Sequence, residues 1–90
     1  MRRLQMRLGG RVQGVGMRWF VHQCAGRHGV TGTVRNAADG TVEINAEGDA
    51  EVLVAFAEDV RSGPVSARVE PIDESWSEGP ARYAGFSIVG

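Results

Sequence analysis

Apolar and polar residues alternate along three stretches of the chain, with the period of two that is typical of half-buried strands. The first stretch has polar residues or glycine between Leu4, Met6, Leu8, Gly10 and Val12. The same period returns at residues 30–35 and 42–46, and Asp39-Gly40 lies between these two runs. Because Asp-Gly favours tight turns, the last two stretches are predicted to form a hairpin.

Two other stretches have apolar residues at helical spacing. Residues 17–28 predict a helix that ends at Gly29, and its apolar stripe consists of Phe20, Val21, Cys24 and Ala25. A second helix is expected to follow Asp49 as its N-cap and to end at Ser62-Gly63-Pro64. Its apolar face consists of Val52, Ala55, Phe56 and Val60.

The C-terminal part of the chain predicts a fourth strand from the alternation at residues 65–69. Pro71 is expected to end this strand or to place it at a sheet edge, because proline has no N–H group for the ladder. Residues 73–85 predict a polar loop in which Trp76 and Tyr83 pack against the sheet.

A short last strand at residues 86–89 completes the order β-α-β-β-α-β plus one terminal strand. This order predicts an α+β, ferredoxin-like sandwich, in which one antiparallel sheet carries two helices on one face. We expect one domain spanning residues 1–90. The first two strands should run in the same direction, so their ends meet at one rim. Residues 13–18 and Asn36 are therefore predicted to be neighbours.

Glycine and arginine are combined in the loop between the first strand and the first helix. Gly14 and Gly16 can adopt positive φ, which lets consecutive N–H groups of residues Gln13, Gly14, Val15, Gly16, Met17 and Arg18 converge on an oxyanion. The helix N-terminus adds unpaired N–H groups, and Arg18 adds a planar fork suited to two phosphoryl oxygens. The simpler interpretation is a strand-to-helix turn with a surface arginine.

The distribution of charge favours an anion site. Residues 1–38 contain seven arginines and no carboxylate, whereas residues 39–90 contain three arginines and eleven acids. The net charge of the whole chain is only −1, and lysine is absent, which excludes a Walker A loop. A small anion fits this distribution better than a nucleic-acid duplex, which usually needs a broad basic surface.

Other chemical side chains have simpler interpretations. Cys24, the only cysteine, falls on the apolar stripe of the first helix and is predicted to be a core residue. His22 and His28 lie on different sides of the same helix, so they cannot share a metal ion. One cysteine, no signal-peptide pattern and no apolar membrane span lead us to expect a cytoplasmic protein.

The predicted site is chemically simple, because it contains Arg18 and Asn36 but no evident nucleophile, metal ligand set or general acid. Hydrolysis of a phosphate monoester normally needs such groups, since it expels a poor alkoxide leaving group. An acyl phosphate instead expels a carboxylate, whose pKa is about 4. The site therefore suits a mixed anhydride, which needs charge stabilisation and a positioned water.

The chain resembles the acylphosphatase family in two separate motifs, Gly10-Arg11-Val12-Gln13-Gly14-Val15-Gly16-Met17-Arg18 and Gly32-Thr33-Val34-Arg35-Asn36-Ala37-Ala38-Asp39-Gly40-Thr41-Val42-Glu43. The likeness continues to Gly85-Phe86-Ser87-Ile88 and so covers nearly the whole chain. It implies a monomeric hydrolase of acyl phosphates that uses no metal or cofactor. It also implies that Arg18 binds the phosphate and that Asn36 positions the attacking water.

The chain departs from the usual family pattern at a few positions. Met17 stands where an aromatic residue is usual, Thr33 where a tryptophan is common, and Ala37-Ala38 where Leu-Pro is common. These departures bear on substrate preference and hairpin rigidity rather than on the proposed chemical groups.

Three alternatives remain open at the level of sequence. A non-catalytic anion-binding module would keep the glycine loop but would not need Asn36. A similar domain also begins larger carbamoyl-transfer proteins, which carry long extensions. An RNA-binding domain of this fold is disfavoured, because its central strands would need stacking aromatic residues where this chain has Leu4, Met6 and Ile44.

Overall fold

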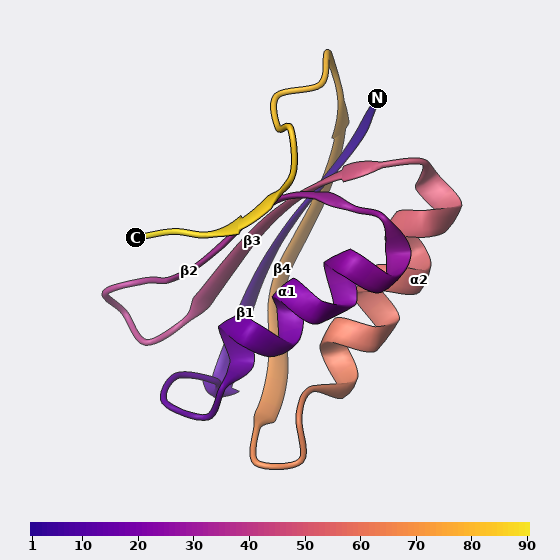
Figure 1. Ribbon diagram of the computed structural model, residues 1–90. Helices are drawn as coiled ribbons and strands as arrows, with labels where there is room; N and C mark the ends of the chain where they lie inside the picture. Colours follow the sequence, from indigo (N-terminus) through magenta and orange to yellow (C-terminus); the bar gives the residue numbers. More distant parts are fainter.

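The computed structural model describes residues 1–90 as five strands and two helices (Figure 1). In chain order they are β1 (Arg2–Arg11), α1 (Met17–His28), β2 (Thr31–Asn36), β3 (Val42–Gly48), α2 (Ala50–Ser62), β4 (Arg68–Glu78) and β5 (Phe86–Ile88). The strands form one sheet in the order β4-β1-β3-β2-β5, and both helices lie on one face of it (Figure 1). The ferredoxin-like arrangement predicted from the element order is therefore confirmed.

One strand pair differs from the antiparallel sheet that we predicted. β1 pairs antiparallel with β3 and β4, and β2 pairs antiparallel with β3. β5 instead runs parallel to β2, with Ile88 opposite Val34, so the sheet is mixed. The reason lies in the connection after β4, which crosses from one edge of the sheet to the other. Because β4 runs opposite to β2, a chain that turns back after β4 enters β5 in the direction of β2.

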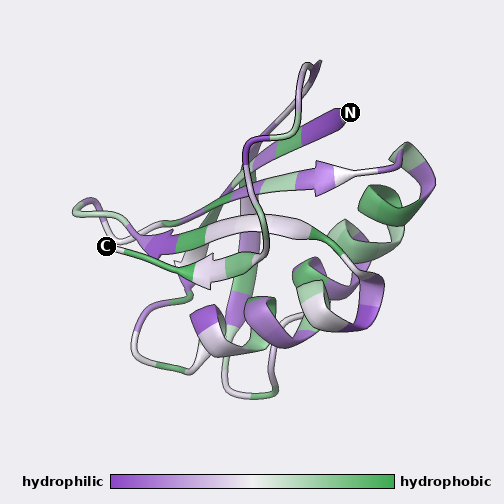
Figure 2. Cartoon of the chain, turned by 45° about the horizontal axis from the view of Figure 1, so that its top comes forward, coloured by the Kyte–Doolittle hydropathy of each residue, from purple (hydrophilic) through white to green (hydrophobic).

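The hydrophobic core lies between the sheet and the helices. Hydrophobic and hydrophilic residues follow one another along the strands (Figure 2), and in β1 and β3 the buried residues are mainly the apolar ones. The buried residues form one cluster, to which α1 contributes Met17, Val21, Cys24 and Ala25 and α2 contributes Leu53, Phe56, Ala57 and Val60. Burial raises the pKa of the Cys24 thiol, in agreement with its predicted core position.

Both helices begin and end where the sequence predicts. Gly29 ends α1 in the left-handed conformation with φ 68°, and its N–H donates to the carbonyl of Ala25. Asp49 occupies the N-cap position of α2 with extended backbone angles, but its side chain makes no capping hydrogen bond. The predicted position is right, whereas the side-chain contact expected of an N-cap aspartate is not formed.

The fourth strand is longer and lies later in the chain than predicted. β4 runs from Arg68 through Pro71 to Glu78, so residues 73–78 of the expected polar loop are strand. Pro71 is tolerated because β4 is an edge strand, and the ladder with β1 shifts register there. Trp76, predicted to pack against the sheet from a loop, is part of this strand and is 40% exposed, with the Arg2 guanidinium 5.4 Å from its ring centre. Tyr83 lies in the loop and is half-buried.

Glu47 on β3 anchors the crossover between β4 and β5 to the sheet. Its carboxylate is almost fully buried and accepts hydrogen bonds from Arg3 Nε at 3.0 Å and from the backbone N–H of Arg82 at 2.9 Å. The hydrogen bond from the Arg82 N–H, with a further contribution from Arg3, holds the pKa of Glu47 below its ordinary value. The ionised carboxylate thus fixes the segment that leads into β5.

This contact predicts a pH-dependent stability. A lowered pKa means that the ionised form stabilises the fold fully above the unfolded pKa of about 4.3, and that this contribution is lost as the pH falls through the folded pKa. We expect Glu47→Gln to be less stable than wild type at pH 7, with a difference that shrinks towards pH 3. Urea unfolding at both pH values measures this, with Glu58→Gln on the exposed face of α2 as the control. An equal stability difference between wild type and Glu47→Gln at both pH values would contradict this prediction.

Candidate active site

A cavity of about 230 Å³ lies between the N-terminus of α1 and the ends of β2 and β5. Its lining residues are Val12, Gly14, Gly16, Met17, Arg18, Trp19, Asn36 and Ile88. β1 and β2 run in the same direction, since each pairs antiparallel with β3, and the cavity lies where both strands end. The structure therefore brings Arg18 and Asn36 together at one rim of the sheet, as the crossover argument predicts.

The backbone of the glycine loop is shaped to receive an anion. Gly14 and Gly16 have φ angles of 75° and 77°, and a Cβ atom at either position would meet no neighbouring atom within 4 Å. Backbone conformation, rather than crowding, is therefore the reason for glycine at both positions. No backbone N–H group from residue 13 to residue 19 donates to another backbone group. The first hydrogen bond of α1 runs from the Phe20 N–H to the Gly16 carbonyl. The N–H groups of residues 13–19 remain available at the positive end of the helix.

Arg18 lies in the first turn of α1 with its side chain exposed. Unlike Arg3, Arg7, Arg27, Arg35, Arg61 and Arg68, it forms no ion pair within the chain. Its guanidinium is thus free to bind an external anion through two parallel hydrogen bonds.

Asn36 ends β2, and its side chain carries the one buried side-chain polar atom in the protein that lacks a hydrogen-bond partner. That atom is Oδ1. A buried acceptor without a partner costs about 1–3 kcal/mol, so such groups call for an explanation. Asn36 lines the same cavity as Arg18, so a rotation of its amide would bring Oδ1 to a molecule bound there.

Gln13 ties the glycine loop to the hairpin that follows Asn36. Its Nε2 donates to the carbonyls of Ala37 at 2.8 Å and Thr41 at 2.9 Å. The hairpin is braced in turn by Asp39, whose Oδ1 accepts from the Thr41 hydroxyl and N–H at 2.6 and 3.1 Å. These bonds from Thr41 lower the pKa of Asp39. The side chain of Gln13 therefore fixes the position of the glycine loop relative to the hairpin that follows Asn36.

Not every residue of the predicted loop lines the cavity. Gln13 and Val15 do not; Val15 packs against the core, and its carbonyl accepts from the Ser66 hydroxyl at 3.2 Å. Met17 lines the cavity but is 1% exposed, so its side chain belongs to the core. Sequence reasoning missed Trp19 and Ile88. The bulky aromatic residue directly after Arg18 was a usable signal, whereas Ile88 had none because only the parallel pairing of β5 brings it here.

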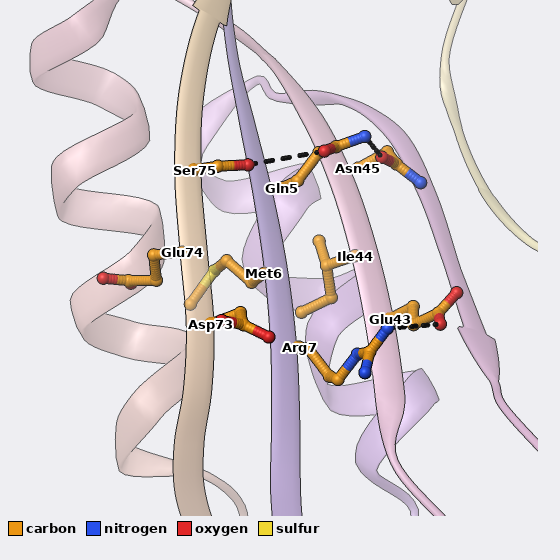
Figure 3. Close-up of a pocket in the computed structure, with 9 residues that line it drawn as sticks. All are labelled: Gln5, Met6, Arg7, Glu43, Ile44, Asn45, Asp73, Glu74 and Ser75. Carbon is orange, nitrogen blue, oxygen red and sulfur yellow. Dashed lines mark hydrogen bonds and ion pairs between the residues drawn. The ribbon is translucent and has the colours of Figure 1, made fainter. Parts of the chain in front are cut away.

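A larger hollow of about 390 Å³ lies on the opposite, open face of the sheet, and Figure 3 shows its nine lining residues. Several of its polar side chains pair with one another. Gln5 donates to Asn45 at 3.0 Å and accepts from Ser75 at 3.4 Å, while Arg7 pairs with Glu43 at 3.7 Å. It lacks both the free guanidinium and the free backbone donors of the smaller cavity, which is why we place the candidate site at the smaller one.

Three further observations concern the whole chain. Nowhere do three or more His, Cys, Asp or Glu side chains gather as a metal site requires. His22 stacks on Trp19, while His28 lies against Asp59 at 2.5 Å, so the two histidines have separate surroundings.

No helix has both the length and the apolar character needed to cross a membrane.

The fold is that of a small α+β protein, and its candidate site combines backbone N–H groups that have no backbone partner with an arginine that has no ion pair. The acylphosphatase family profile matches residues 4–88. An acylphosphatase from Salinibacter ruber is 45% identical over 87 residues, which cover 97% of this chain and 92% of that relative. The crystal structure of acylphosphatase from Bacillus subtilis has a TM-score of 0.95 at 39% identity and covers 100% of both chains. The T. kodakarensis HypF crystal structure has a TM-score of 0.86 at 32% identity, covering 99% of this chain but 12% of that longer one.

The chain belongs to the acylphosphatase family. The names of its relatives and the nearly complete coverage support an enzyme with acylphosphatase activity, which is a hydrolase function. None of these similarities favours the alternative of a non-catalytic anion-binding module. Membership of the family implies a small-molecule acyl phosphate as the substrate.

Proposed function

We propose that acyl phosphates are hydrolysed in the cavity that Arg18 and Asn36 share, with Arg18 binding the phosphoryl group and Asn36 positioning the attacking water. The observation that carries this proposal is that Asn36, whose Oδ1 has no hydrogen-bond partner, lines the same cavity as Arg18, whose guanidinium has no ion pair. The Asn36 amide offers an acceptor, Oδ1, as well as a donor, Nδ2, whereas an anion uses donors alone. An acceptor beside donors suits a water molecule next to a phosphoryl group.

The proposed reaction is a direct displacement at phosphorus. The loop N–H groups and Arg18 bind the phosphoryl oxygens and stabilise the charge that develops on them. The water held by Asn36 Oδ1 forms the new oxygen–phosphorus bond as the bond to the carboxyl oxygen breaks. An amide oxygen orients water but does not take its proton, so the proton leaves with the product phosphate. The carboxylate needs no general acid, because its pKa is about 4.

We also propose that residues 1–90 act as a single domain and a monomer in the cytoplasm, without a metal or a nucleic-acid partner. One core cluster supports the single domain. The lone, buried Cys24 fits a reducing compartment. The absence of clustered ligand side chains supports chemistry without a protein-bound metal. The net charge of −1 argues against a nucleic-acid surface.

The direct test is hydrolysis of acetyl phosphate by the purified chain. We expect release of inorganic phosphate in EDTA at the same rate as in its absence, because no side-chain cluster requires a metal. The measurement is phosphate release at pH 7, corrected for spontaneous hydrolysis. Activity that disappears in EDTA and returns with magnesium or zinc would refute the metal-free mechanism, and no activity under any condition would refute the function.

Inorganic phosphate is expected to bind the same cavity and stabilise the fold. Phosphate at about 100 times its Kd should add about 2.7 kcal/mol to the free energy of unfolding. For a domain of this size that corresponds to a rise in Tm of roughly 10–20 °C. Thermal unfolding with and without phosphate measures the shift, with sodium chloride at equal ionic strength as the control. If phosphate shifts Tm no more than chloride and does not compete with acetyl phosphate, the cavity is not the site.

A further inference from the structure

Two exposed apolar side chains line the cavity beside the proposed phosphoryl site. Trp19 and Ile88 both line the cavity, and they are 58% and 40% exposed. Trp19 comes from the first turn of α1 and Ile88 from the end of β5, so they approach the cavity from different elements. Exposed apolar surface of this kind, next to a polar site, often marks a ligand-binding surface.

The indole ring of Trp19 is held in place by other aromatic rings. It stacks on the imidazole of His22, with ring centres 5.3 Å apart and an angle of 6° between the planes. His22 meets Phe86 edge-on at 6.2 Å, and Phe86 packs at 6.2 Å against Phe56, which is fully buried. The exposed indole is therefore connected to the core. A ring that is already ordered loses little conformational entropy when it binds a ligand.

Trp19 lies where the acyl end of the substrate is expected to bind. The loop donors and Arg18 recognise the phosphoryl group, so the acyl group must lie on the remaining wall of the cavity or at its mouth. The exposed apolar surface of that wall belongs to Trp19 and Ile88. The volume of about 230 Å³ is below the roughly 300–1,000 Å³ of pockets for drug-sized ligands, which restricts the substrate to a small acyl phosphate.

We propose that Trp19 and Ile88 form an acyl subsite that favours flat, apolar acyl groups, so that aromatic acyl phosphates are the preferred substrate class. This inference rests on the proposed function of the cavity. The indole binds an aromatic acyl group by stacking, and Ile88 covers its edge. A methyl group has too little surface to gain from either contact.

The test compares benzoyl phosphate with acetyl phosphate. Trp19→Ala is expected to lower kcat/KM for benzoyl phosphate about 10-fold, mainly through KM, and to lower kcat/KM for acetyl phosphate by a clearly smaller factor. Trp19→Phe should restore most of the loss, because it keeps an aromatic face. The matched control is Trp76→Ala, which removes the other tryptophan, on β4, and should alter neither substrate. The Tm of each variant confirms that it is folded.

Binding without turnover gives a second measurement. Benzoylphosphonate and acetylphosphonate carry a carbon–phosphorus bond in place of the labile link, and calorimetry gives the Kd of each. Trp19→Ala should weaken only benzoylphosphonate. Equal losses for both acyl groups, or no loss for either, would overturn the acyl subsite. If wild type hydrolyses neither acyl phosphate, the proposed function fails, while the phosphonate comparison still decides whether Trp19 recognises the aromatic group.

Discussion

Arg18→Gln is expected to weaken phosphate binding and to reduce kcat/KM for acetyl phosphate by at least about 100-fold. Charge-assisted hydrogen bonds contribute about 1.5–3 kcal/mol each, so losing a bidentate pair costs about 3–6 kcal/mol. Each 1.36 kcal/mol is about a factor of ten in rate. Arg18 is exposed and has no partner in the chain, so the free energy of unfolding without phosphate should change little.

The matched control for this variant is Arg11→Gln. Arg11 is also an exposed arginine without an ion pair, it lies at the end of β1, and it does not line the cavity. Both variants change the net charge equally, so a general electrostatic effect would reduce the activity of both. Arg18→Lys keeps the charge but loses the planar fork and should recover only part of the activity. Phosphate affinity and kcat/KM that remain at wild-type values in Arg18→Gln would exclude Arg18 from the site.

Asn36→Ala is expected to separate catalysis from binding. The variant removes no charge, so phosphate should bind with nearly wild-type affinity. Loss of one positioned polar group typically lowers turnover about 100- to 1,000-fold, and we expect a kcat effect of that size. The substitution also removes a buried acceptor that has no partner, so the urea midpoint should not fall. Phosphate release, phosphate affinity and urea unfolding of the same protein measure the three effects.

Asn45→Ala provides the control, because Asn45 lies on β3 at the open face and its amide oxygen accepts from Gln5. It should leave turnover unchanged. A lower urea midpoint with retained turnover in Asn36→Ala would mean that Asn36 is only a turn residue. Wild-type turnover and stability together would refute its role in positioning water.

The elements that bury one face could be predicted from the sequence because burial leaves a periodic pattern. The alternation of Leu4, Met6 and Leu8 predicts β1, and the buried faces of both helices follow from their apolar spacing. β4 was misplaced for the same reason. It is an edge strand whose residues are largely exposed, so no apolar period marks it, and its backbone ladder with β1 defines it instead.

The sequence by itself determined the parts of the site whose residues are close in the chain. Gly14, Gly16 and Arg18 form the loop and the helix N-terminus through local backbone geometry, and the crossover rule then placed Asn36 beside them. Only the tertiary structure decided the contacts between distant segments. The Gln13 bonds to the hairpin, the parallel pairing of β5 and the approach of Ile88 to Trp19 depend on packing and on the direction of the final crossover. Local residue patterns do not encode these interactions.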